Sequence, residues 1–463
     1  MTGVAGSDVK AGAPERAVRP RRDTTIAVSL FVILFAIYNA NGREIGTYDS
    51  QPTKFAAREL LLRGTLHLDE VVRQTPEYAK RWGFILAADG HYRSVYSPVP
   101  AVLAAVLSWP LTATGLLDPR APLAPALIAK LAASLLVTLA VVLSFFTARQ
   151  WLGPVRATIL ALGLGLGTGL WSTVSQTLWQ TETAVVGLAL AVHALCRNSP
   201  QGAGGLLVGV GLAVAGMTRP QLAPIVAVLL AALWMRSSKR DAILGTAIVL
   251  LSGMAIAALN VKWFGHPLGA QALLQDVNAS LHATGPMFTF SPEGAAGLLM
   301  SPSRGILIFS PIVLVAIAAL PGAFKAGWRS PLPWCALALL AQFGLYASYS
   351  VWWGGHTYGP RYMLDLLPVA VPLAAFTMAS YPGRRPILAS CGAAALVWSI
   401  VVAATGAFCY PHDRWNTEPT EIDLDHSRLW SFTDSQIQRC WARGMSPQNF
   451  RLFDRAAVRP PNP

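Results

Sequence analysis

Long runs of apolar residues alternate with short polar segments over most of the chain. Residues 24–42 form the first run, which has about the ~20 residues that an α-helix needs to cross a bilayer. The runs interpreted as later crossings are residues 124–148, 157–175, 180–196, 203–218, 220–236, 242–262, 306–324, 332–351, 362–381 and 387–409. This pattern predicts an all-α polytopic membrane protein with about eleven transmembrane helices.

The first long polar interval, residues 43–97, separates the first run from the rest. Residues 53–63 carry apolar side chains at helical spacing, which predicts a juxtamembrane helix lying along the membrane surface. Residues 83–97 contain Asp89-Gly90, a turn signal between two strand-like segments. We therefore expect a first outer loop with a surface helix and a short hairpin.

Charge gives the chain an orientation. Only 13% of its residues are charged, against roughly 25% in soluble domains. The net charge is +13, but the basic residues lie in short clusters between apolar runs, so we expect no nucleic-acid partner. If residues 98–117 form a non-crossing apolar helix, the clusters share one side with the N-terminus, as the positive-inside rule requires. The alternative, in which 98–117 crosses and the count is twelve, stays open. The clusters are Arg149 with Arg156, Arg197, Arg236 with Lys239 and Arg240, Lys325 with Arg329, and Arg384 with Arg385.

The expected organisation follows from these assignments. Residues 1–23 form a disordered basic cytoplasmic leader, 24–409 the transmembrane domain, 263–305 a second outer loop, and 410–463 a small extracytoplasmic tail. The protein is expected to be a multi-pass cell-membrane protein with its N-terminus in the cytoplasm and its C-terminus outside. None of the five cysteines has metal-ligand spacing. Whether Cys409 and Cys440, both outside, form a disulfide is left open.

The unusual polar motifs gather on the outer side, which indicates a functional site there. Charged groups at membrane depth are costly unless they are paired or face a cavity. Asp49 follows the first crossing closely and is a candidate general base, with a solvated acid at a helix end as the alternative. Arg304 has no nearby acid in sequence and suits a phosphate. Arg361 and Asp365 are four residues apart, so an ion pair between them competes with a substrate contact.

Three strings and the order of elements resemble the GT-C superfamily of polyprenyl-phosphate-dependent glycosyltransferases. The resemblance is to the bacterial branch related to protein O-mannosyltransferases and aminoarabinose transferases, and it covers residues 24 to 409. The strings are Tyr48-Asp49-x-x-Pro52 followed by Leu62-x-Gly64-x-Leu66-x-Leu68-Asp69-Glu70, Ser301-Pro302-Ser303-Arg304-Gly305 with Ser310-Pro311, and Gly354-Gly355-His356-x-Tyr358-Gly359-Pro360-Arg361-Tyr362.

The resemblance implies a GT-C-like helical bundle with extracytoplasmic juxtamembrane helices. It also implies an inverting transfer of a sugar from a polyprenyl-phosphate carrier to a hydroxyl acceptor, which would be a glycan, a lipid or a protein of the cell envelope. Asp49 would take the proton of the acceptor. Cationic groups would hold the leaving phosphate. The donor-binding candidates are Lys54, Arg304, Arg361 and His356, and the substrate-lining candidates are Glu182, Tyr358 and Trp353.

Several of these roles have an alternative. Glu182 could be a buried hydrogen-bonded acid, His356 a hydrogen-bond partner within its loop, and Trp353 or Tyr358 part of the interfacial aromatic belt. The chain also departs from the family, since Ser50 follows Asp49 where protein O-mannosyltransferases have a second acid. This leaves open whether Asp49 acts alone and whether a divalent cation takes part. Two other functions remain open, a flippase or transporter of a lipid-linked glycan and an envelope glycan polymerase or ligase.

Overall fold

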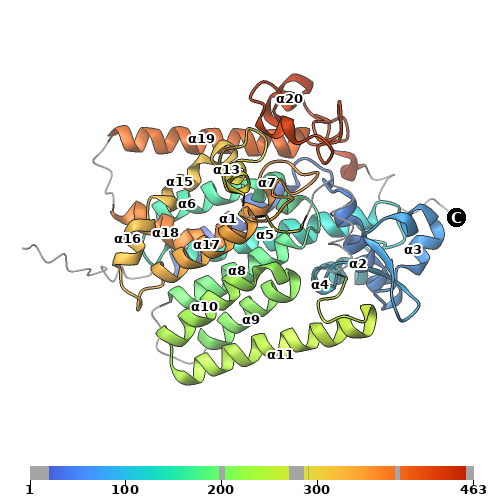
Figure 1. Cartoon of the computed structure of the whole chain (residues 1–463), viewed down its shortest axis with the longest axis horizontal. Coiled ribbons are helices and arrows are strands. Elements are labelled where there is room, and N and C mark those ends of the chain that lie inside the picture. Colours follow the sequence, from blue (N-terminus) through green and yellow to red (C-terminus); the bar gives the residue numbers. More distant parts are fainter. Residues whose placement is uncertain (1–19, 198–203, 271–285, 290, 381–385, 455–463) are drawn as a thin grey trace, which may run out of the picture.

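The computed structural model describes residues 20–197, 204–270, 286–289, 291–380 and 386–454. Most of the predicted leader and part of the predicted second outer loop therefore lie outside the described residues. Helices that run along the long axis of the molecule form its body, and shorter elements cover the end that carries α2 and α3 (Figure 1). The prediction of an all-α polytopic membrane protein is confirmed.

The body of the bundle consists of apolar helices of very different lengths. They are α1 (Pro20–Asn39), α5 (Ala124–Ala148), α6 (Pro154–Leu166), α7 (Gly169–Ser172), η3 (Val174–Gln176), α8 (Thr181–Cys196), α9 (Gly204–Thr218), η4 (Pro220–Leu222), α10 (Ala223–Arg236), α11 (Lys239–Phe264), α13 (Pro292–Met300), α14 (Ile306–Phe309), η5 (Pro311–Val313), α15 (Leu314–Ile317), α16 (Leu320–Lys325), α17 (Leu332–Ala347), η6 (Arg361–Leu366), α18 (Leu367–Ser380) and α19 (Pro386–Cys409).

The predicted count of eleven crossings is not confirmed. Five helices in the described part of the chain are long and apolar enough to span a bilayer, or six if the pair bent by 43° between α6 and α7 is one span. Other predicted crossings are short or broken helices. The run at 306–324 is divided into α14, η5, α15 and α16, because Pro311 and Pro321 cannot supply the backbone N–H groups of a continuous helix.

Helices α1 and α5 run antiparallel. At one end, Arg149 donates hydrogen bonds to both carboxylate oxygens of Asp23, at 3.0 and 2.9 Å. Toward the other end, the amide of Asn39 donates to the hydroxyl of Ser134 at 3.0 Å. The intervening residues 40–123 thus leave and re-enter the bundle at the same end.

The first loop contains the predicted surface helix and hairpin. The surface helix is α2 (Gln51–Arg63), and it ends at Gly64 in the left-handed conformation, with φ of +65°. After α3 (Asp69–Gln74) and η2 (Pro76–Lys80), β1 (Phe84–Leu86) pairs antiparallel with β2 (Tyr92–Ser94), and Phe84 lies opposite Ser94. The predicted helix and hairpin are therefore present, and the position of the helix along the membrane surface stays a prediction.

Helix α4 (Val99–Ala113) lies within the predicted non-crossing segment 98–117. It packs on α2 and α5, and Figure 1 views it nearly along its axis while α5 and α11 run across the picture. Its 15 residues are too few to span ~30 Å of hydrocarbon at 1.5 Å per residue. Val106 and Trp109 on its outer face are exposed.

Small residues allow close packing at the centre of the bundle. A Cβ atom added to Gly187 of α8 would lie 2.6 Å from the carbonyl oxygen of Gly211 of α9. One added to Gly211 would lie 2.5 Å from the carbonyl oxygen of Gly187. The two backbones therefore approach closely, as small residues permit between membrane helices.

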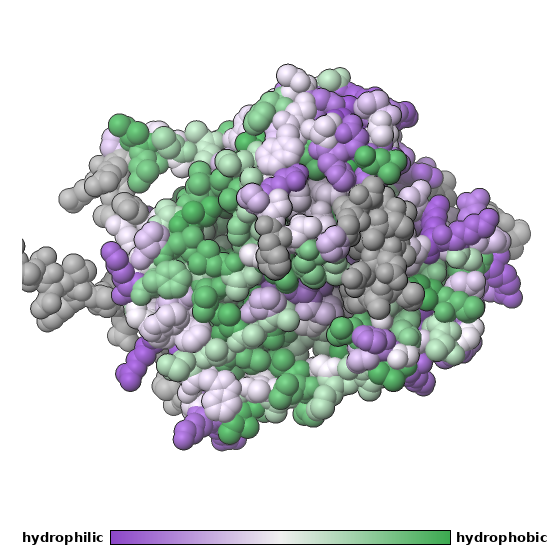
Figure 2. Space-filling view, in the orientation of Figure 1, coloured by the Kyte–Doolittle hydropathy of each residue, from purple (hydrophilic) through white to green (hydrophobic). Residues whose placement is uncertain are grey.

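The surface carries a hydrophobic band. Figure 2 shows hydrophobic side chains over the middle of the molecule and hydrophilic ones toward its two ends. Large apolar residues of α11, including Leu250, Leu251 and Met254, are about 60% exposed. Such a band on a bundle is typical of a surface that faces lipid.

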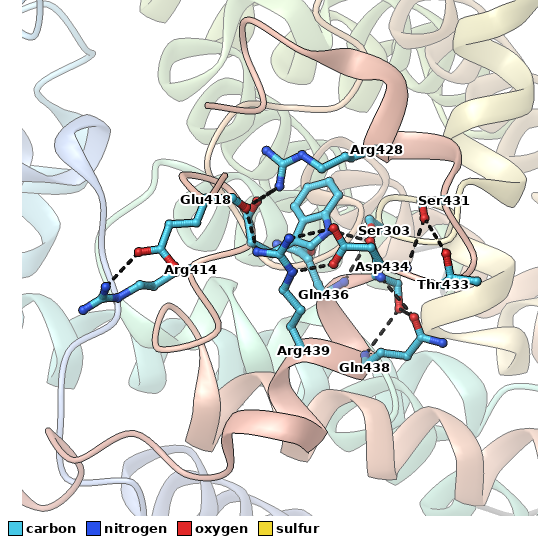
Figure 3. Close-up of polar contacts among 12 residues, drawn as sticks. Ser303, Arg414, Glu418, Arg428, Ser431, Thr433, Asp434, Gln436, Gln438 and Arg439 are labelled. Carbon is cyan, nitrogen blue, oxygen red and sulfur yellow. Dashed lines mark hydrogen bonds and ion pairs between the residues drawn. The ribbon is translucent and has the colours of Figure 1, made fainter. Parts of the chain in front are cut away.

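Residues 410–454 form a small folded unit, here called the C-terminal appendage. It contains η7 (His426–Trp430), α20 (Gln436–Arg443) and η8 (Arg451–Phe453), and a disulfide joins Cys440 to Cys409 at the end of α19. Figure 3 shows Arg439 between Asp434 and the carbonyl of Glu418, and Gln436 beside Ser303 of the bundle. The question of the Cys409–Cys440 disulfide, left open by the sequence, is resolved in favour of the bond.

Candidate functional site

A cavity of about 1240 Å³ lies at the end of the bundle that carries the first loop and the appendage. Its lining comes mainly from residues 46–51, 80–83, 95–97, 216–221, 253–260, 354–362 and 410–424. Segments that are remote in sequence therefore converge on one space. The volume exceeds the lower range of small-ligand pockets, ~300 Å³, by several-fold.

Asp49 lies in the wall of this cavity. It belongs to η1 (Tyr48–Ser50), a short turn that begins where the hydroxyl of Thr47 accepts a hydrogen bond from the backbone N–H of Asp49. The carboxylate side chain is 25% exposed. One of its oxygens accepts a hydrogen bond of 2.8 Å from Nη1 of Arg361. The predicted base is thus reachable, and it is held by a partner 312 residues away in sequence.

Arg361 also lines the cavity. It opens η6, and its guanidinium lies over the ring of Trp179, with 4.6 Å from its Cζ to the ring centroid. Its Nε is buried and has no hydrogen-bond partner among the described residues. Because the side chain lines the cavity while it holds Asp49, its positive charge is placed where an anion could bind, a role that a planar guanidinium serves well.

Asp365 does not pair with Arg361. It pairs instead with Arg219, at 3.2 Å, and accepts a hydrogen bond of 2.6 Å from the hydroxyl of Tyr346. Arg219 lines the cavity and donates a second bond to the hydroxyl of Thr181 at 2.6 Å. The cavity thus has two arginines in its lining, each with a carboxylate partner.

Two further cations line the cavity from the first loop. Lys80 ends η2, and Arg81 follows it. The guanidinium of Arg81 lies 4.1 Å from the ring centroid of Tyr48 and donates to the amide oxygen of Gln51 at 3.1 Å. These contacts hold one cation beside the turn that carries Asp49.

Arg304 has a different environment from the one expected of a phosphate ligand. It is fully buried and is not part of the described cavity lining. Its guanidinium donates to five neutral oxygens at 2.6 to 3.0 Å: the carbonyls of Trp353, Ser303 and Gly355, and the side chains of Gln436 and Asn416. It therefore joins the loop around Gly355 to the appendage.

Four other predicted site residues lie behind the cavity wall. Lys54 forms an ion pair with Glu44 at 2.6 Å. Glu182 is buried, and one of its oxygens accepts a hydrogen bond from the backbone N–H of Trp179 at 2.9 Å. The lining described for the cavity also omits Tyr358, whose hydroxyl donates to the carbonyl of Val402, and Trp353. The structure thus brings Asp49, Arg361 and His356 to one cavity, and not these four or Arg304.

His356 faces two acids of the appendage. Its Nε2 lies 3.0 Å from a carboxylate oxygen of Asp423 and 3.2 Å from one of Glu421. All three residues line the cavity. Burial alone would lower the pKa of His356, but the two neighbouring carboxylates outweigh it and raise the pKa above the ordinary value.

Sequence reasoning missed several lining residues. For Arg219, the available signal was its position directly after an apolar run and before Pro220. Glu421 and Asp423 gave no signal, because they lie in a tail whose folding the composition does not specify. Asp413 of the same tail also lines the cavity, and neither of its carboxylate oxygens has a hydrogen-bond partner among the described residues.

Three comparisons with known proteins were informative to different degrees. No family model and no curated protein matches the sequence. Among solved structures, ArnT from Cupriavidus metallidurans bound to undecaprenyl phosphate is similar, with 15% identity, a TM-score of 0.49, and coverage of 83% of this chain and 69% of that one. The archaeal oligosaccharyltransferase AglB from Archaeoglobus fulgidus, in complex with an inhibitory peptide and a dolichol-phosphate, has 13% identity, a TM-score of 0.43, and coverage of 86% and 58%.

Both structures belong to the GT-C glycosyltransferases, the class that the sequence motifs resemble. Identities of 15% and 13% say nothing about the reaction of this chain. Its function has to be inferred from its own cavity.

Proposed function

We propose that the chain is an integral-membrane glycosyltransferase. It moves a sugar from a polyprenyl-phosphate carrier to a hydroxyl acceptor on the extracytoplasmic face, with inversion at the anomeric carbon and Asp49 as general base. The observation that carries this proposal is the pairing of Asp49 with Arg361 in the wall of a large cavity. A base and an anion-binding group are thereby held in one space.

The proposed reaction needs a proton acceptor and a site for the leaving phosphate. The acceptor hydroxyl gives its proton to the carboxylate of Asp49 as its oxygen attacks the anomeric carbon. The bond between that carbon and the phosphate oxygen breaks, and the lipid phosphate leaves with the bonding electrons. A positioned base of this kind contributes typically ~10²–10⁴-fold to the rate.

Binding of the donor would also prepare the base. Arg361 engages Asp49 with Nη1 and also lines the cavity. A donor phosphate that draws the guanidinium toward itself would weaken its hold on Asp49 and leave that carboxylate available for the acceptor. Arg219, Lys80 and Arg81 add positive charge to the same cavity, which favours the charge that develops on the phosphate.

The apolar part of the cavity suggests where the prenyl chain lies. Gly216 and Met217 of α9 and Gly253, Ile256 and Ala257 of α11 belong to its lining. Helix α11 is also largely exposed on its outer face. We therefore assign the lipid path to α9 and α11 rather than to α4, which contributes no residue to the described lining.

The same proposal includes an orientation. We place the N-terminus in the cytoplasm and the cavity outside, with segment 98–117 not crossing. The antiparallel packing of α1 on α5 supports this, since the chain between them returns to the same end of the bundle. An Asp118→Cys variant with Cys196, Cys335 and Cys391 replaced by Ser should be labelled from outside intact cells by an impermeant maleimide. Labelling only after the cells are opened would contradict the orientation.

The decisive experiment is transfer by the purified protein in liposomes that contain a radiolabelled polyprenyl-phosphate sugar. Asp49→Asn should lower transfer by at least about 10²-fold, because the amide cannot accept the proton, while donor binding stays within a few-fold. Glu77→Gln, an exposed acid of η2 outside the cavity lining, is the matched control and should transfer normally.

Two results would contradict the proposal. Full transfer by Asp49→Asn would remove Asp49 from the role of base. Movement of the intact lipid-linked glycan between leaflets, without transfer to any hydroxyl, would indicate a flippase instead.

A further inference from the structure

The cluster of His356, Glu421 and Asp423 has the composition of a metal site. One imidazole nitrogen and two carboxylate oxygens come within 4.8 Å of one another. The imidazole lies in the loop between α17 and η6, and both acids lie in the appendage. The group therefore joins two parts of the chain that are more than sixty residues apart in sequence.

The geometry within the cluster fits a cation. Two ligand atoms at right angles around a metal, each ~2.1 Å from it, are ~3.0 Å apart. Nε2 of His356 lies 3.0 Å from the Asp423 oxygen and 3.2 Å from the Glu421 oxygen. The same Nε2 is shielded from solvent and makes no well-aligned hydrogen bond with a described residue. This imidazole nitrogen and the two carboxylate oxygens thus surround one point.

Neighbouring residues fix the proposed ligands. Trp353 donates its indole N–H at 2.9 Å to one oxygen of Asp423, and the other oxygen of Asp423 is the one near His356. Arg304 holds the carbonyls of Trp353 and Gly355, on either side of the turn that leads to His356. Gly354 and Gly355 both have positive φ, +75° and +68°, so the loop reaches its position through backbone that glycine adopts freely. Outer contacts of this kind typically orient metal ligands.

We propose that His356, Glu421 and Asp423 bind one divalent cation in the wall of the cavity. The mixed set of one nitrogen and two oxygen ligands suits Mn²⁺ or Zn²⁺ better than Ca²⁺, which prefers oxygen ligands alone. The bound ion links the appendage to the 354–356 loop, because it takes ligands from both. It also places a positive charge on the cavity wall, where a phosphoryl group can complete its coordination.

The cluster has a competitor in the first loop that the experiment must exclude. His67, Asp69 and His91 also bring three possible ligand atoms together, although Nε2 of His67 lies 3.0 Å from the guanidinium of Arg93. That cluster lies outside the cavity lining. Metal titrations are therefore made in a His91→Ala background.

The test uses the full chain in detergent, stripped with a chelator, and titrated with Mn²⁺ at pH 7.5 while free Mn²⁺ is followed by electron paramagnetic resonance. One Mn²⁺ per chain is expected. His356→Ala, Asp423→Asn and Glu421→Gln should each weaken binding at least tenfold, and Glu77→Gln should not. Absence of saturable binding, or binding unchanged by His356→Ala and Asp423→Asn, would overturn the proposal.

A second measurement separates metal binding from a plain ion pair between His356 and the acids. Added Mn²⁺ should raise the melting temperature of the stripped protein, and Glu421→Gln should abolish that rise while leaving the protein folded. A melting temperature that does not respond to Mn²⁺ would contradict the proposed fastening of the appendage. Neither measurement uses a sugar donor, so both stand apart from the outcome of the transfer assay.

Discussion

Two aspartate–arginine pairs lie near opposite ends of the bundle, and their surroundings differ. At one end, Asp23 and Arg149 are joined at 2.9 Å, and their side chains are only 3% and 6% exposed. At the other end, Asp49 and Arg361 are joined at 2.8 Å, with 25% and 10% exposed, beside a cavity. The first pair is sealed between α1 and α5, whereas a ligand can reach the second.

The comparison shows that the contact alone does not distinguish a structural pair from a site. The two distances are nearly equal, and both pairs join segments far apart in sequence. What differs is the presence of a cavity and of further cations around Asp49. Substitutions should therefore affect stability at one pair and chemistry at the other.

The largest expected effect on stability is at the sealed pair. Asp23→Asn would leave the Arg149 charge buried without its counter-charge, which costs typically ~3–5 kcal/mol. The free energy of unfolding in detergent should fall by about that amount, while the affinity of the remaining folded protein for donor stays unchanged. A variant as stable as the wild type would mean that solvent or lipid headgroups reach Arg149. The Asp23–Arg149 pair would then not be the structural counterpart of the Asp49–Arg361 pair.

A smaller effect, on function, is expected at the open pair. Arg361→Gln removes a charge that we assign to the leaving phosphate, and loss of one such donor costs roughly 10²-fold in rate. The transfer rate at saturating acceptor should fall by about that factor, with a melting temperature close to that of the wild type. A large loss of stability with normal turnover of the folded fraction would make Arg361 structural, like Arg149.

The smallest effect concerns Asp413, which lines the same cavity and whose carboxylate oxygens have no hydrogen-bond partner in the described part of the chain. Burial raises the pKa of Asp413 to about 6. In the unfolded chain an aspartate has a pKa of ~3.9, so the folded state binds the proton of Asp413 more tightly than the unfolded state does. The free energy of unfolding therefore falls as the pH rises through 6 and Asp413 loses this proton. Between pH 5 and 7 the wild type should lose about 1 kcal/mol relative to Asp413→Asn.

Unfolding curves of the two proteins at pH 5, 6 and 7 provide the measurement. The difference in stability should grow in favour of Asp413→Asn as the pH rises. Parallel pH profiles would show that Asp413 has the same proton affinity in both states, and that water or a ligand solvates it within the cavity.

Sequence patterns predicted the parts of the fold that depend on local chemistry. The apolar run at 124–148 became α5 with the expected bounds, and Asp89-Gly90 became the turn of the hairpin. The run at 306–324 was predicted as one helix, since hydropathy does not register how Pro311 and Pro321 interrupt backbone hydrogen bonding. Continuity of a helix was thus less predictable than the presence of apolar segments.

The site was predictable only in part, because burial and pairing are long-range properties. Arg304 and Arg361 both occur in conspicuous polar strings, and nothing local separates them. Their roles diverge because Arg304 is enclosed by five neutral acceptors, one of them 132 residues away, whereas Arg361 lies at the cavity. The contribution of Glu421 and Asp423 depends on the folding of the whole appendage.

The C-terminal appendage is hydrogen-bonded to the segment that follows the first helix. Arg43, just after α1, donates to the carbonyl of Tyr410 at 2.7 Å, and the backbone N–H groups of Phe450 and Leu452 donate to the carbonyls of Asn41 and Gly42. The end of the first helix and the last described residues thus lie next to each other. During synthesis, a nascent protein would carry Asp49 for most of translation without a finished cavity around it. Because the described cavity lining runs from residue 46 to residue 424, its wall is complete only after residues 410–424 of the appendage have been synthesised.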